Sequence, residues 1–170
     1  VDIFEKEIKN QNLSILGWRE VPVNSKVVGN IASQTQPKIK QVFIGKNNQN
    51  LSDVEFNTKL YVARKITENT LYNIDFSQKN YFYFSSLHNR TLIYKGLLVP
   101  EDIDKFFVDL SNPELVTRLA LVHQRFSTNT FPTWDLAQPF RYMCHNGEIN
   151  TLKGNYSRMN TREELLKNEF

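Results

Sequence analysis

Cysteine is nearly absent from this chain of 170 residues, in which Cys144 is the only one. A single cysteine excludes a disulfide framework within the chain. The sequence also has no apolar run near the ~20 residues that a membrane-spanning helix needs, so no span is expected. The formal net charge is only +3, and the basic residues are too scattered to follow a phosphate backbone. Nucleic-acid binding is therefore not expected.

What is present is the composition of a globular domain. Apolar residues make up 40% of the chain, aromatic residues 12% and charged residues 23%. These fractions differ from those of disordered and fibrous chains. The length fits one domain of ordinary size or part of a larger one.

Both ends of the chain carry helix signals. The apolar spacing of the first eight residues predicts a helix over about residues 1–11. At the other end, Thr161 is predicted to cap a second helix, with Glu164 completing a capping box. Because neither end shows a complete boundary, we interpret the sequence as an internal fragment of a larger domain, incomplete at both ends.

Between the ends, strand and helix signals alternate irregularly. A helix is predicted from Asp53 and another from Pro100, where proline and acidic residues suit a first turn. Apolar, aromatic or β-branched residues predict strands over residues 13–19, 38–45, 59–66, 81–87, 91–96 and 119–123. The short link between 81–87 and 91–96 indicates a hairpin. This mixed order favours an α+β fold over a doubly wound parallel sheet.

The first dense polar cluster follows the predicted buried strand 119–123. It reads His-Gln-Arg-Phe-Ser-Thr-Asn-Thr over residues 123–130. These groups would be unpaired in a core, so the chain is expected to emerge there at a surface or polar pocket. Arg125 offers a rigid fork of donors for a carboxylate, and Thr128 and Asn129 offer further hydrogen bonds. The alternative is that Arg125 pairs with a structural acid and the other residues form a turn.

The second cluster is centred on Asn146 and Gly147. An asparagine side-chain amide beside a glycine backbone N–H can form a two-donor oxyanion hole, which stabilises a tetrahedral intermediate. The alternative is a simple β-turn, since Asn-Gly is a common turn pair. Cys144 is not expected to be a nucleophile, because adjacent strand residues point to opposite faces and His145 would point away from it. Cys144 and the three histidines also lack the spacing of a zinc site.

Taken together, these clusters closely resemble the glutamine amidotransferase domain of glutamate synthase large chains. The specific segments are His-Gln-Arg-Phe-Ser-Thr-Asn-Thr, Trp-Asp-Leu-Ala-Gln-Pro-Phe-Arg and His-Asn-Gly-Glu-Ile-Asn-Thr, in that order. Weaker matches upstream are Leu-Gly-Trp-Arg-Glu-Val-Pro-Val, Tyr-Val-Ala-Arg-Lys and Leu-Ile-Tyr-Lys-Gly-Leu-Leu. The resemblance covers essentially all of residues 1–170. It implies part of a class II domain with the N-terminal-nucleophile αββα four-layer sandwich.

The resemblance also implies roles for individual residues. In this family an amino-terminal cysteine attacks the glutamine carboxamide, with its own α-amino group as general base. Arg125 falls at the position that holds the glutamine α-carboxylate, and Asn146 and Gly147 fall at the oxyanion hole. Thr128 and Asn129 fall at neighbouring substrate-contact positions.

The expected nucleophile is missing, because Val1 stands first and Cys144 does not align with the catalytic cysteine. These 170 residues alone are therefore expected to be inactive.

For the complete protein, the resemblance implies FMN, an iron–sulfur cluster and, in one alternative, FAD, with none of them bound by this segment. The implied partners are glutamine, synthase domains of the same polypeptide, and either ferredoxin or an NAD(P)H-oxidising subunit. Abundant Asn, Lys and Ile suit an AT-rich genome, which favours a plastid stroma and ferredoxin over a bacterial cytoplasm. Two alternatives remain: a non-catalytic structural or assembly domain of this fold, and the amidotransferase domain of another glutamine-dependent synthase.

Overall fold

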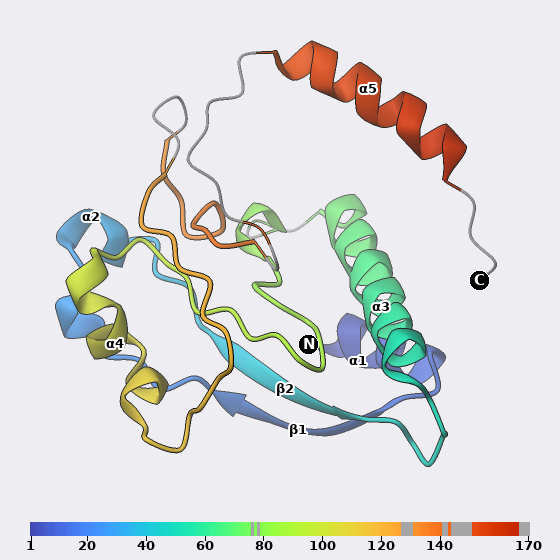
Figure 1. Ribbon diagram of the computed structural model, residues 1–170, viewed down its shortest axis with the longest axis horizontal. Coiled ribbons are helices and arrows are strands. Elements are labelled where there is room, and N and C mark those ends of the chain that lie inside the picture. The colour runs from blue at the N-terminus through green and yellow to red at the C-terminus, as the bar shows by residue number, and fades with distance from the viewer. Residues whose placement is uncertain (76, 78, 127–130, 141–142, 144–150, 167–170) are drawn as a thin grey trace.

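The chain folds around a two-stranded antiparallel ribbon (Figure 1). The computed structural model describes residues 1–75, 77, 79–126, 131–140, 143 and 151–166. In chain order, its elements are α1 (Asp2–Asn10), β1 (Ser14–Glu20), the 3₁₀ helix η1 (Ser25–Val27), α2 (Asn30–Ser33), β2 (Lys40–Gly45), α3 (Asp53–Asn73), η2 (Lys79–Tyr81), η3 (Pro100–Asp102), α4 (Ile103–Phe106), η4 (Val108–Ser111) and α5 (Leu152–Leu165). This mixture confirms the predicted α+β class.

The ribbon and the first helix confirm local sequence signals. The predicted helix over residues 1–11 is α1, and the predicted strands 13–19 and 38–45 are β1 and β2. The two strands pair from Ser14 opposite Gly45 to Glu20 opposite Lys40, with one irregularity near Gly17. The predicted helical start at Pro100 is also confirmed, as η3 leading into α4.

One apolar cluster packs against the ribbon, and a second packs against Val21 and Ile39, just beyond its strands. The first joins α1 and α3 and is made by Phe4, Ile8, Leu13, Phe56, Leu60 and Ala63. The second is made by Phe106, Phe107 and Trp134. In Figure 1, α1 and α3 lie beside each other at one end of the ribbon, and α2 and α4 lie toward its other end. No residue of α5 is buried.

The predicted strand over residues 59–66 is wrong, because α3 continues through it to Asn73. A complete capping box begins the helix: the Ser52 hydroxyl accepts the Glu55 backbone N–H, and the Glu55 carboxylate accepts the Ser52 backbone N–H. The buried residues then recur every three or four positions, at Phe56, Leu60, Ala63 and Thr67. That is the period of a helix, which therefore overrides the β-branched residues in this stretch.

The predicted hairpin of strands 81–87 and 91–96 is also wrong, since neither segment is a strand. One link between the segments runs from the Ile93 backbone N–H to the Ser86 hydroxyl, at 3.3 Å, in place of a backbone ladder. Adjacent side chains instead enter different clusters, Tyr83 the second and Phe84 the first. Aromatic residues favour strands largely because their side chains pack well there, and both segments here achieve that packing without pairing as strands.

The predicted buried strand 119–123 is exposed and irregular. Leu119 is 81% exposed and Val122 78% exposed. An apolar run predicts a buried strand only where another element covers it, and no described element does so here.

The predicted capping role of Thr161 is wrong as well, because α5 begins ten residues earlier than predicted. Its N-cap is Thr151, whose hydroxyl accepts the Gly154 backbone N–H at 3.2 Å. Thr161 lies inside the helix, where its hydroxyl donates to the Ser157 carbonyl at 3.0 Å. A threonine can bond back to the preceding turn in this way, which makes it compatible with a helix interior.

Candidate functional site

The predicted site residues fall mostly outside the described part of the chain. Those not described are Thr128, Asn129, Asn146 and Gly147, and Cys144, which is not a predicted site residue, is not described either. Arg125 is described: its side chain is exposed, and its backbone N–H donates to His123 Nδ1 at 3.1 Å. Within the described ranges, its guanidinium forms no ion pair with a carboxylate. The proposed grip on a substrate carboxylate stays a prediction.

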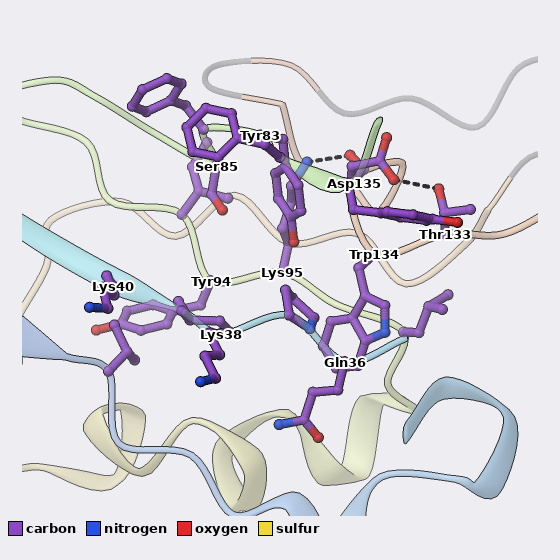
Figure 2. Close-up of a pocket in the computed structure, with 18 of the residues that line it drawn as sticks. Gln36, Lys38, Lys40, Tyr83, Ser85, Tyr94, Lys95, Thr133, Trp134 and Asp135 are labelled. Carbon is purple, nitrogen blue, oxygen red and sulfur yellow. Dashed lines mark hydrogen bonds between the residues drawn. The ribbon is translucent and has the colours of Figure 1, made fainter. Parts of the chain in front are cut away.

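A cavity of about 2170 Å³ is lined by residues of both apolar clusters (Figure 2). Phe126 and Phe131, the described residues on either side of positions 127–130, both line it. Phe131 is 79% exposed, so this part of the lining faces solvent. Other lining residues come from α2 and from β2, such as Val42.

One wall of the cavity carries a buried cation. Lys95 is 7% exposed, and its ammonium donates to the Asp135 backbone carbonyl at 2.6 Å. The same ammonium lies 5.3 Å from the centre of the Tyr83 ring and 4.7 Å from that of Phe140. Both distances fit cation–π attraction. Figure 2 shows the Lys95 ammonium directed at the Asp135 main-chain oxygen, while the Asp135 carboxylate is turned toward Thr133.

Burial and charge shift the pKa values of this wall in opposite ways. Burial lowers the pKa of Lys95, and the nearby Asp135 carboxylate partly opposes that change. Burial raises the pKa of Tyr83 to about 12, with a further contribution from Asp135. The Asp135 carboxylate accepts a hydrogen bond from the Thr133 hydroxyl at 2.6 Å, which fixes its direction. The Tyr83 phenol thus lies close to the Lys95 ammonium and within the electrostatic influence of the Asp135 carboxylate.

Gly96, which follows Lys95, has no Cβ and so leaves room for the Trp134 ring. A Cβ at position 96 would lie 2.5 Å from Trp134 Cζ3 and 2.8 Å from Cε3, closer than atoms can approach. Trp134 is 3% exposed, and its indole N–H donates to the Ala32 carbonyl at 3.1 Å. Its ring packs on Phe106 with 5.6 Å between centroids. Lys95 and Gly96 together therefore place the segment of residues 131–140.

A second polar group is centred on Asp109 and includes Tyr94, which lines the cavity. Asp109 accepts hydrogen bonds from the Arg19 guanidinium and from the Tyr94 hydroxyl, the latter at 2.8 Å. Burial and the Asp109 carboxylate raise the pKa of Tyr94 to about 12. The hydrogen bond from Arg19 is the main cause of a lowered pKa at Asp109. This group links β1 to η4 and to the segment that carries Lys95.

Sequence reasoning missed Lys95, Asp135 and Trp134 as parts of one wall. A signal was present, since Lys95 is the one charged residue in the apolar run over residues 92–99. A charge in such a run is buried only when it has partners. Its partners come from 12 residues upstream and 40 residues downstream, so the pairing needs the tertiary structure.

Metal-ligating side chains do not gather in the part of the chain that the structure describes: no three of its His, Cys, Asp and Glu side chains form a group. Its helices are also too short or too polar to cross a membrane. The whole chain has one cysteine, whereas iron–sulfur clusters are held by several thiolates, so these residues do not fit such a cluster.

Comparison with known proteins decides the family. The model of the class-II glutamine amidotransferases matches residues 1–170. The chain belongs to this family. This confirms the resemblance inferred from the polar clusters.

Relatives of this class-II amidotransferase chain include three glutamate synthases. The chain is 47% identical to the NADPH glutamate synthase large chain of Bacillus subtilis over 164 residues, which is 95% of this chain and 10% of the relative. It is 42% identical to the NADH glutamate synthase of Saccharomyces cerevisiae, covering 96% and 8% of the two chains. It is 44% identical to the ferredoxin-dependent glutamate synthase 1 of Arabidopsis thaliana, covering 98% and 10%. The chain thus spans about a tenth of the length of these relatives.

Proposed function

We propose that this chain is part of the glutamine-hydrolysing domain of a glutamate synthase. In that reaction, water replaces the amide nitrogen of glutamine, which gives glutamate and ammonia. The ammonia then condenses with 2-oxoglutarate, and two electrons and two protons complete a second glutamate with loss of water. The observation that carries the proposal is similarity to glutamate synthases over nearly the whole chain, at 42–47% identity.

In this proposal the substrate is held at both ends. Arg125 grips the α-carboxylate of glutamine through two parallel hydrogen bonds, and Thr128 and Asn129 add contacts nearby. The Asn146 side-chain amide and the Gly147 backbone N–H stabilise the oxyanion formed at the carboxamide carbon. The exposure of Arg125, without a carboxylate partner among the described residues, supports its availability to a substrate.

The nucleophile of the proposed reaction is an amino-terminal cysteine and not Cys144. The mechanism uses the free α-amino group of the nucleophile as general base, and an internal cysteine has none. We further propose that residues 1–170 are part of a four-layer αββα sandwich, to which the ribbon of β1 and β2 contributes. FMN, an iron–sulfur cluster and any FAD are proposed to belong to other domains of the polypeptide.

We propose ferredoxin as the electron donor and the plastid stroma as the compartment. Support comes from the abundance of residues with AT-rich codons and from the ferredoxin-dependent relatives. The alternative is an NAD(P)H-oxidising subunit in a bacterial cytoplasm, as the name of the Bacillus relative suggests. Supplying reduced ferredoxin and NAD(P)H separately to the protein distinguishes these donors.

Isotope labelling tests the proposed reaction. The polypeptide that carries this chain is supplied with 2-oxoglutarate, reductant and glutamine labelled with ¹⁵N at the amide. We expect one α-¹⁵N-glutamate and one unlabelled glutamate for each glutamine consumed. Glutamine consumption that does not depend on 2-oxoglutarate and places no label in glutamate would contradict a glutamate synthase. No glutamine consumption at all would favour a non-catalytic domain.

A further inference from the structure

Lys95 is a buried cation that the proposed chemistry does not use. Among the described residues, Lys95 and Thr67 are the buried polar or charged side chains, and Lys95 alone carries a charge. Removing an ammonium from water is costly unless hydrogen bonds and opposite charge replace the lost hydration. The groups that contact the Lys95 ammonium therefore indicate what its positive charge stabilises.

Most of those contacts come from a single segment. The Asp135 carbonyl accepts the 2.6 Å hydrogen bond, the Asp135 carboxylate supplies opposite charge, and the Phe140 ring faces the ammonium at 4.7 Å. Tyr83, on a neighbouring segment, completes the enclosure. Lys95 thus contacts both the middle and the end of residues 131–140, while Gly96 leaves room for the ring of Trp134, the residue before Asp135.

This segment connects the two predicted halves of the substrate site. It follows the cluster that contains Arg125, Thr128 and Asn129, and it precedes Asn146 and Gly147. Phe126 and Phe131, on either side of positions 127–130, both line the cavity, and Phe131 is 79% exposed. A shift of the segment would move the two halves relative to each other, and catalysis is sensitive to displacements near 1 Å.

We propose that Lys95 is a positioning residue for amide hydrolysis, holding residues 131–140 so that the carboxylate grip and the oxyanion hole stay aligned. This inference rests on the proposed function. Lys95 acts through the segment and does not touch the substrate. Its loss should therefore slow glutamine hydrolysis without impairing the use of free ammonia, because ammonia bypasses the amide site.

The test compares Lys95→Met, Lys95→Arg and Lys105→Met in the complete polypeptide. Methionine keeps much of the apolar stem but loses the charge and the donors. We expect Lys95→Met to lower kcat with glutamine at least tenfold, to change KM for glutamine less than threefold, and to leave the ammonia-dependent rate within twofold of the parent. Lys95→Arg restores a cation and donors and should recover at least a third of the lost kcat. Lys105 is an exposed lysine paired with Asp102, so Lys105→Met should change neither rate.

Three results would overturn the proposal. The first is an unchanged kcat with glutamine in Lys95→Met, and the second is a parallel loss of both rates, which marks a merely structural lysine. The third applies if Lys95→Met does not fold. Phe140→Leu then serves as the second variant, because it removes the ring that lies 4.7 Å from the Lys95 ammonium, at a position that is already 38% exposed. An unchanged ratio of the glutamine-dependent to the ammonia-dependent rate in Phe140→Leu would contradict the positioning role of Lys95. A parent protein without any glutamine-dependent activity would instead contradict the proposed function itself.

Discussion

Replacing Gly96 by alanine tests how closely the cavity wall is packed. The added Cβ would lie 2.5 Å from Trp134 Cζ3, about 1 Å inside the ~3.5–4.0 Å at which carbon atoms attract each other. The indole cannot simply retreat, because it is 3% exposed, packs on Phe106 and donates to the Ala32 carbonyl. Either the backbone at position 96 or the ring must move.

The expected cost follows from those contacts. Overpacking a filled core costs about 1–3 kcal/mol, and a buried indole N–H that loses its partner costs about 1–3 kcal/mol more. Because the ring need not lose its hydrogen bond fully, we expect Gly96→Ala to lower the free energy of unfolding by about 2–4 kcal/mol. Gly17→Ala is the matched control, since a Cβ there meets nothing within 4 Å.

Urea denaturation followed by tryptophan fluorescence measures both variants. A double-mutant cycle adds Trp134→Leu, which removes the clashing ring atoms, so Gly96→Ala should cost at least about 1 kcal/mol less in that background. The packing argument is refuted if Gly96→Ala costs no more than Gly17→Ala, or if the cost is the same with and without the indole.

Two further predictions concern charged groups. Asp109 has a lowered pKa from its hydrogen bonds to Arg19 and Tyr94, so its carboxylate stabilises the fold above its ordinary pKa of 3.8 and loses that effect as pH falls through the folded-state value. Asp109→Asn should therefore lower the free energy of unfolding by about 1–2 kcal/mol at pH 7, a modest cost because Arg19 is partly exposed. The difference in stability from the parent should shrink below pH 3.8. A difference that stays constant in urea titrations from pH 7 to 3 would contradict this prediction. In the complete enzyme, Arg125→Lys should raise KM for glutamine at least tenfold and change kcat less than threefold, because a lysine ammonium cannot form the two parallel hydrogen bonds of a guanidinium. A fall in kcat at constant KM in steady-state assays would assign Arg125 another role.

The parts of the fold that the sequence predicted are those with complete local signals. The amphipathic spacing of α1, the alternation in β1 and β2, and the proline at the start of η3 each lie within a few adjacent residues. The predictions that failed concern segments without such complete local signals. Residues 81–96 and 119–123 have strand-forming side chains, but a strand also needs a paired neighbour, which local sequence does not contain.

The candidate site divides in the same way. Arg125, Thr128, Asn129, Asn146 and Gly147 stay predictions, which their residue types and order support because these carry recognisable chemistry. Lys95 was not found, because its partners Tyr83, Asp135 and Phe140 are brought to it only by tertiary packing. A charged residue inside an apolar run indicates that such partners exist without identifying them.

Asn146→Ala in the complete enzyme tests whether this chain provides the oxyanion hole for glutamine hydrolysis. The measurement is the ratio of glutamine-dependent to ammonia-dependent glutamate synthesis. We predict that kcat with glutamine falls by about 10²–10³, with little change in KM, while the ammonia-dependent rate stays unchanged. If both rates fall together, or if KM for glutamine rises while kcat holds, Asn146 is a structural or substrate-binding residue and the account is wrong.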